Sequence, residues 1–125
     1  MGSKGRPCRT VMVDGFEVLV GKSDEENDVL TFDVAAPGDF WLHVAGGVPG
    51  SHVVVRNPEG LDELPDPVVE RAAALAVWHS KARGRRRVEV HLCRAADVRK
   101  RRGAPPGEVL LRRWTAIRVD RPPGE

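Results

Sequence analysis

Cysteine, aromatic residues and long apolar runs are all scarce in this sequence. Two cysteines, Cys8 and Cys93, are too few to staple a disulfide scaffold, and we expect a cytoplasmic protein with reduced thiols. Aromatic residues make up only 5% of the chain, so the place of each one carries information. No stretch approaches the roughly 18 apolar residues of a membrane span, and the basic opening lacks the apolar run of a secretory signal. We therefore expect no membrane partner.

The residue patterns of catalysis and metal binding are also missing. No Cys-x-x-Cys, His-Glu-x-x-His or Gly-x-Gly-x-x-Gly spacing occurs. Asp39, Ser51 and His52 have triad residue types, but neighbouring residues of one strand point to opposite faces, so Ser51 and His52 cannot be nucleophile and base. A zinc site would have to gather residues that are distant in sequence, namely His43, His52, His79, His91 and Cys93. We expect no catalytic residue, no cofactor and no metal.

Charge is distributed unevenly, although the net charge is only +2. Residues 14–39 contain eight acidic side chains and a single basic one, Lys22. Residues 81–102 contain ten Lys or Arg and two acidic side chains, Glu89 and Asp97. One strongly positive face is the electrostatic pattern of a polyphosphate binder. A solvated basic surface without a ligand is the alternative that this pattern leaves open.

The 125 residues suffice for one domain, and their pattern predicts an α+β fold in which two helices pack on an antiparallel sheet. Helices are expected at 24–34 and 67–82, and strands at 16–20, 40–44, 51–56, 87–93, 108–113 and 115–119. An Asp14–Gly15 turn precedes the first of these strands. Trp78 and Trp114 are expected in the core. The domain covers residues 1–125, with its core at about 9–119 and a frayed tail at 120–125.

The strand from Phe40 to Val44 carries two kinds of side chain. Alternation places Phe40, Leu42 and Val44 on one face, which suits a core, and Trp41 and His43 on the other. Aromatic rings on a sheet surface receive single-stranded RNA bases by stacking. Alternatively, Trp41 belongs to a second buried layer beneath the longer helix.

A glycine-rich turn follows this strand. Gly46, Gly47 and Gly50 permit close backbone approach and positive φ, so their N–H groups could hold a phosphate, with Ser51 and His52 as further donors. Ordinary hairpin chemistry explains the same glycines equally well.

Several blocks of sequence, taken in order, resemble the NFACT RNA-binding domain of the fibronectin-binding-protein-like ribosome quality-control factors. The blocks are residues 15–22, 26–31, 39–44, 49–55, 72–76, 80–83, 98–100 and 103–109. The most specific part is Asp-x-Trp-x-His at 39–43 followed by Pro-Gly-Ser-His at 49–52. The resemblance extends from about residue 9 to 119, and we expect this domain to stand alone.

The resemblance implies RNA binding without catalysis. In the family this module follows other domains, binds tRNA and the large ribosomal subunit, and helps to extend stalled nascent chains. Carried over by motif, the shared site would comprise Asp39, Trp41, His43, Gly50, Ser51, His52, Ser80, Lys81 and Arg83. Contacts to the RNA backbone would come from Arg99, Lys100, Arg101 and Arg102.

Two functions follow as hypotheses from this sequence. The first is a module that binds tRNA or structured rRNA, and the second is a protein-interaction domain that docks on ribosomal or nascent-chain surfaces. The turn between His43 and His52 is one residue longer than the family pattern, but a hairpin there would still bring the two imidazoles together. We expect His52 to serve RNA more than folding, and its protonation or that of His43 to tighten binding as pH falls from about 8 to 6.

Overall fold

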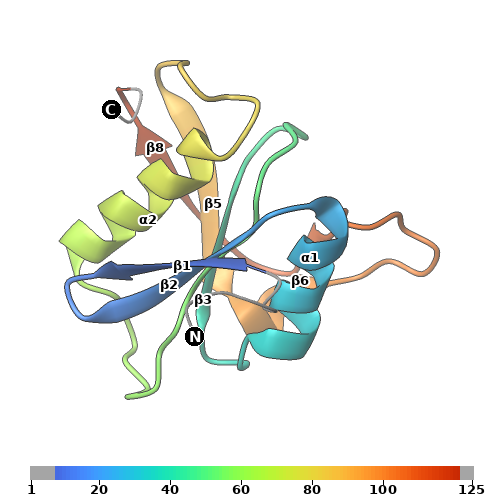
Figure 1. Ribbon diagram of the computed structural model, residues 1–125, viewed down its shortest axis with the longest axis horizontal. Coiled ribbons are helices and arrows are strands. Elements are labelled where there is room, and N and C mark those ends of the chain that lie inside the picture. Colours follow the sequence, from blue (N-terminus) through green and yellow to red (C-terminus); the bar gives the residue numbers. More distant parts are fainter. Residues whose placement is uncertain (1–7, 122–125) are drawn as a thin grey trace.

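Six antiparallel strands form the main sheet, with helices on both of its faces (Figure 1). The structure is a computed structural model that describes residues 8–121. The strand order is β1-β2-β4-β3-β5-β8. Its strands are β1 (Cys8–Val13), β2 (Phe16–Gly21), β3 (Phe40–Val44), β4 (Val53–Val55), β5 (Val88–Arg94) and β8 (Thr115–Val119). A small second sheet pairs β6 (Val98–Arg99) with β7 (Leu110–Leu111). The predicted α+β class is confirmed.

The helical segments are short, and the first of them begins with a side-chain cap. Helix α1 (Asp24–Val29) begins after Ser23, whose hydroxyl accepts a hydrogen bond from the Glu26 backbone N–H at 3.2 Å. It continues without a break as the π-helical turn η1 (Leu30–Val34), so the predicted helix at 24–34 is confirmed in extent. Helix α2 (Asp66–Trp78) carries a proline in its first turn, and a 3₁₀ turn, η2 (Ala95–Asp97), follows β5. Among the described residues, no helix is long and apolar enough to cross a membrane.

Three strand predictions need correction. Strand β1 was not predicted, because its outward residues are mixed and it forms an edge of the sheet. It is joined to β2 through Asp14 and Gly15, whose φ values of 49° and 88° give the predicted tight hairpin turn. The strand expected at 108–113 is only the two-residue β7, and the one expected at 51–56 is only β4. Strand β4 is short because the backbone N–H groups of Ser51 and His52 donate to His79 and Asn27 and not to a neighbouring strand.

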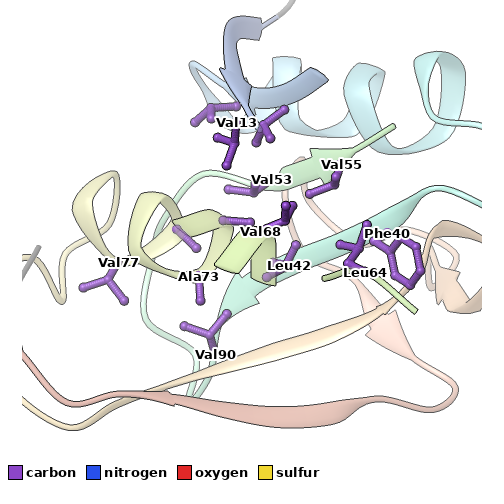
Figure 2. Packing of buried hydrophobic residues seen from close by; sticks show 14 of the residues in the cluster. Val13, Phe40, Leu42, Val53, Val55, Leu64, Val68, Ala73, Val77 and Val90 are labelled. Atoms are coloured by element: carbon purple, nitrogen blue, oxygen red, sulfur yellow. The ribbon is translucent and has the colours of Figure 1, made fainter. Parts of the chain in front are cut away.

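The sheet separates two cores. Helix α2 covers an aliphatic core to which Leu42, Val53, Val55 and Val68 belong (Figure 2). The opposite face holds a smaller core under α1 and η1, formed by Cys8, Leu19, Leu30, Trp41, Val54, Cys93 and Val98. Trp41 is 1% exposed, so it is a second-layer core residue as one alternative held. It lies beneath the shorter helix rather than α2, because strand alternation turns Phe40 and Leu42 toward α2.

Candidate functional site

Three aromatic rings meet at the end of β3 next to α1. The His43 and His52 ring centroids are 5.3 Å apart, which confirms that the hairpin brings the two imidazoles together. Trp41 stacks on His43 at 5.9 Å with an interplanar angle of 28°, and it meets His52 edge-on at 5.0 Å. His43 is half-buried, whereas His52 is 1% exposed. Of the two imidazoles, only that of His43 is accessible to a ligand.

The buried members of this cluster are tied together through Thr31 of η1. The Thr31 hydroxyl accepts a hydrogen bond from Trp41 Nε1 at 3.0 Å and lies 2.7 Å from His52 Nδ1. His52 Nε2 lies 3.1 Å from the Gly107 carbonyl oxygen, which can only accept, so Nε2 carries the proton. In a neutral ring Nδ1 then accepts from the Thr31 hydroxyl. The polar side-chain atoms of Trp41, Thr31 and His52 are then all hydrogen-bonded.

The environment keeps both imidazoles neutral. Burial, reinforced by the nearby His43 ring, lowers the pKa of His52 to about 4. Burial is also the main cause that lowers the pKa of His43, partly offset by hydrogen bonding to the Gly50 backbone. The expectation that His52 gains a proton between about pH 8 and 6 is therefore wrong, and the lowered pKa of His43 acts against protonation there as well. The expectation that His52 serves folding little is also wrong, because its side chain is buried and hydrogen-bonded at both nitrogens.

Asn27 of α1 fixes the backbone beside this cluster. Its amide oxygen accepts a hydrogen bond from the His52 N–H at 3.0 Å, and its amide nitrogen donates to the Gly50 carbonyl at 3.2 Å. Position 21 must be glycine, because a Cβ there would collide with the Asn27 side chain. The glycine turn is therefore held from α1 by one side chain, and its path depends on that contact.

Asp39 lies at the other end of β3 and has a structural task. It is 2% exposed, and its carboxylate accepts hydrogen bonds from the backbone N–H groups of Ala36 and Asn57, both at 2.8 Å. Arg56 Nε completes its shell at 2.9 Å. Buried and fully satisfied, Asp39 ties the end of η1 to the end of β4 and is not presented to a ligand.

The turn after β3 is clamped against the end of α2. The Ser51 N–H donates to the His79 carbonyl and the Lys81 N–H to the Pro49 carbonyl, both at 2.9 Å. This ladder ends α2 at Trp78, four residues before the predicted end at 82. Gly50 allows the close approach, because a Cβ there would lie 2.6 Å from the Ser80 Cβ. The hydroxyls of Ser51 and Ser80 are both used locally, donating to the carbonyls of Gly21 and Val77.

A cationic groove of about 370 Å³ lies along this clamp. Basic side chains at its edge come from Lys22 before α1 and from Lys81 and Arg83 after α2. The Arg83 guanidinium lies 3.4 Å over the Trp78 ring, which holds it in place while leaving it exposed. Three cations that flank one open groove, with hydroxyls and backbone at its floor, suit a phosphate-bearing chain.

A second groove, of about 380 Å³, adjoins the first at Pro49 and Gly50. Its walls are the turn at 45–50 and the segment 106–109, and its lining includes His43 and His91. Seven of the predicted site residues line the two grooves: Trp41, His43, Gly50, Ser51, Ser80, Lys81 and Arg83. Trp41 is almost fully buried in the floor, His52 supports this region from beneath, and Asp39 lines neither groove.

The basic run at 99–102 is divided between two roles. Lys100 Nζ contacts the Asp28 carboxylate at 2.9 Å and donates to the carbonyls of Pro105 and Glu108 at 2.6 and 3.0 Å. Arg101 pairs with Glu108 at 3.1 Å. Arg99 is exposed at the end of β6, and Arg101 and Arg102 are exposed on the segment that projects between β6 and β7 (orange in Figure 1). Lys100 thus stabilises its own loop, and Arg99 and Arg102 are the exposed cations of the run for which no ion pair is seen among the described residues.

Thiol and metal chemistry find little support in the described residues. Both cysteines are buried, and burial raises the pKa of the Cys93 thiol to about 12. Within residues 8–121, no group of three or more His, Cys, Asp or Glu is placed to hold a metal ion.

Sequence reasoning missed several residues on which the site depends. Asn27 and Thr31 lie in a block that carried the family resemblance, yet a polar residue in a helix gives no sign of which partner it will meet. Gly107 and Asp28 were missed because their contact joins segments that are far apart in the sequence. The Gly107 N–H donates to the Asp28 carboxylate at 3.0 Å, and this bond docks the 100–108 loop on α1. Lys22 was counted only as a lone base in an acidic segment.

The fold and the site define a small α+β binding domain that presents cations and imidazoles along two joined grooves. The NFACT protein RNA binding domain family matches residues 7–113, and the chain belongs to that family, as the motif resemblance predicted.

Relatives of known sequence and structure agree with this assignment. The Rqc2 homolog RqcH of Streptococcus suis (strain 05ZYH33) is 41% identical over 115 residues, covering 91% of this chain and 20% of the relative. The Rqc2 homolog RqcH of Bacillus subtilis (strain 168) is 42% identical over 95 residues, covering 76% and 16%. The solved C-terminal part of the fibronectin/fibrinogen-binding protein from Streptococcus suis superposes with a TM-score of 0.81 at 38% identity, covering 93% of this chain and 45% of that one. The chain thus spans a fifth or less of these two curated relatives.

Proposed function

We propose that this chain is a non-catalytic module that binds tRNA or structured rRNA in the cytoplasm, in ribosome-associated quality control, with the large ribosomal subunit as a possible platform. The observation that carries the proposal is the cationic groove edged by Lys22, Lys81 and Arg83. Membership of an RNA-binding family and similarity to the RqcH proteins support it.

The groove suits a structured RNA because one of its cations is preset. The Arg83 guanidinium is held over Trp78, and the backbone of Lys81 is fixed to Pro49, so less order has to be gained on binding. Exposed arginines continue from this groove along the loop to β5 at positions 85, 86 and 87. A positive path of this kind follows the phosphates of a helix and reads shape rather than sequence.

Salt-dependent binding to a tRNA tests the proposal. The double variant Lys81→Gln/Arg83→Gln should weaken binding, and each lost phosphate contact should lower the log–log salt slope by roughly 0.7 to 0.9. Arg71→Gln is the matched control, because Arg71 is exposed on α2 and lies outside both grooves. Binding that does not depend on salt, or that responds equally to the control, would favour the alternative of a protein-interaction domain.

His43 supplies a second, separable test. Because His43 is half-buried and lines a groove, whereas His52 is buried, His43→Ala is the histidine variant that should lose RNA affinity. A loss of about 1 kcal/mol, the contribution of one polar hydrogen bond, is expected. The same variant with unchanged affinity would remove the second groove from the interface.

A further inference from the structure

One half-exposed tryptophan is not explained by the fold. Trp114 was expected in the core, but it is 51% exposed just before β8. Exposed indoles are costly to leave in water unless they have a partner, and aromatic residues are scarce in this chain. Trp114 also lies just outside residues 7–113, the range that the family matches.

Trp114 is the outer end of a row of rings across the sheet. Trp41 stacks on His43, and His43 is the direct cross-strand partner of His91 on β5. The His91 ring lies 5.2 Å from the Trp114 ring at an interplanar angle of 37°. We call these four residues (Trp41, His43, His91 and Trp114) the aromatic row. It runs from a fully buried ring to a half-exposed one, and its inner part forms the floor of the second groove.

The orientation of the row is fixed by neighbouring side chains. His91 Nε2 lies 3.0 Å from the Glu89 carboxylate, which holds the plane of the imidazole. Ala116 is the cross-strand partner of His91, and its small side chain adds little bulk beside the ring. Ala116 and Arg118 alternate onto this face of β8, opposite to α2, and Trp114 directly precedes the strand. The outer part of the row is therefore a pair of contacting rings, of which the inner one is oriented by Glu89.

We propose that the aromatic row is a stacking platform for unpaired bases of the bound RNA, with Trp114 receiving the outermost base. This inference rests on the proposed function and adds a substrate class, namely structured RNA with an adjoining single-stranded segment. Charge favours nucleic acid over an apolar peptide, because exposed Arg113 immediately precedes Trp114 at the outer end of the row. Arg118 is also exposed, further along β8, where it pairs with Asp120. Stacking tolerates any base, so the platform selects for unpaired bases and not for sequence.

Two RNAs test the platform: a blunt hairpin, and the same hairpin with a short single-stranded oligoadenylate extension. Wild-type protein should bind the extended hairpin more tightly. Trp114→Ala should weaken binding of the extended hairpin by roughly five- to a hundredfold and leave the blunt hairpin unaffected, since this is the range measured for loss of one stacked base. Trp114→Phe, which keeps a ring, should retain most of the preference.

Phe32→Ala is the matched control, because Phe32 is 40% exposed on η1 and outside the aromatic row. The Phe32→Ala variant should bind the blunt and the extended hairpin as tightly as wild-type protein does. A bromouridine placed in the extension should also crosslink to Trp114 in the unmodified protein, which keeps the test independent of how the variants fold.

The outcomes separate the two proposals. If wild-type protein binds both hairpins equally, if Trp114→Ala weakens both equally, or if the crosslink maps elsewhere, the platform is refuted while RNA binding in the cationic groove stands. If wild-type protein binds neither hairpin, the proposed function fails and the platform fails with it.

Discussion

Aliphatic side chains such as Leu42 and Val53 pack the α2 face of the sheet, whereas on the α1 face Trp41 shares its surroundings with Thr31 and His52. The first kind of packing depends on volume and tolerates exchange of one apolar residue for another. The second kind depends on hydrogen bonds with fixed donors and acceptors, so each member specifies the position of the next.

This difference between the two faces determines where the groove-lining loops are held. The glycine turn and the 100–108 loop are both anchored on the α1 face, through Asn27 and His52 to Gly50 and Gly107. The α2 face contributes bulk stability and, at its end, the backbone ladder that presents Lys81. One face therefore stabilises the domain, and the other face sets the geometry of its surface loops.

The largest effect should come from Trp41→Ala, which we expect to reduce the free energy of unfolding by about 3–5 kcal/mol. The variant removes a buried indole and leaves the Thr31 hydroxyl without its donor. Leu42→Ala, on the opposite face, should cost about 2–5 kcal/mol without that polar loss. Denaturant unfolding of both variants measures the comparison. If Trp41→Ala reduced the free energy of unfolding by less than every aliphatic core substitution does, a second core on the α1 face would be contradicted.

Acid should destabilise the domain through His52. Its folded-state pKa, lowered to about 4 by burial, lies below that of the unfolded chain, so between these values the unfolded state binds a proton that the folded state does not. The free energy of unfolding should therefore fall as pH falls, by roughly 3 kcal/mol in total between about pH 6.5 and 4. His52→Gln removes the titrating group, and its stability should depend less on pH across that window. An unchanged pH dependence would assign the proton uptake to other groups.

Substitutions in the basic run at 99–102 should change the free energy of unfolding less than Trp41→Ala does, and by different amounts at Lys100 and Arg102. Lys100→Met breaks the contacts to Asp28 and two carbonyls and should cost roughly 1–3 kcal/mol of stability. Arg102→Met should change stability by no more than about 0.5 kcal/mol, because this side chain is exposed. Thermal unfolding measures the stabilities, and RNA titration at several salt concentrations measures the binding. Only the Arg102 variant should lower the salt slope without loss of stability.

The smallest expected effect is that of pH on RNA binding. Because burial lowers the pKa of both His43 and His52, neither imidazole should gain a proton near neutrality. Affinity for a tRNA should therefore change by less than about twofold between about pH 8 and 6. Anisotropy titrations at constant ionic strength measure it. A tightening of severalfold at the lower pH would mean that a groove histidine takes up a proton when RNA binds.

Much of the architecture follows from local pattern. Alternation at Phe40–Val44 correctly assigned which side chains face each core, and the capping residues before α1 placed that helix. The Asp14–Gly15 dipeptide predicted the turn before β2, because both residue types tolerate the positive φ that the turn requires, although the strand on its other side was not predicted. These features depend on neighbours in sequence, so the sequence reveals them.

Features that depend on distant partners could not be predicted. Lys100 belongs to a run of four cations and gave no sign that it alone would be drawn inward, because Asp28 approaches it only in the folded chain. Asp39 matched a family motif, but motif position does not distinguish a ligand contact from a buried carboxylate with three partners. Trp114 follows two arginines and precedes a strand, a context that does not reveal which face of β8 remains open.

The strand order has a consequence for the rates at which backbone amide protons exchange with solvent. β3 is hydrogen-bonded on both sides, to β4 and β5, and β4 is likewise enclosed by β2 and β3. β1 and β8 are the two edges, and the basic loops lie outside the sheet. Amides of β3 and β4 should open only with the whole domain, whereas those beside Trp114 and Arg102 should open locally and exchange early. His43 should thus stand on the slowest-exchanging part of the molecule, while Trp114 and Arg102, the proposed outer contacts, should stand on faster-exchanging parts.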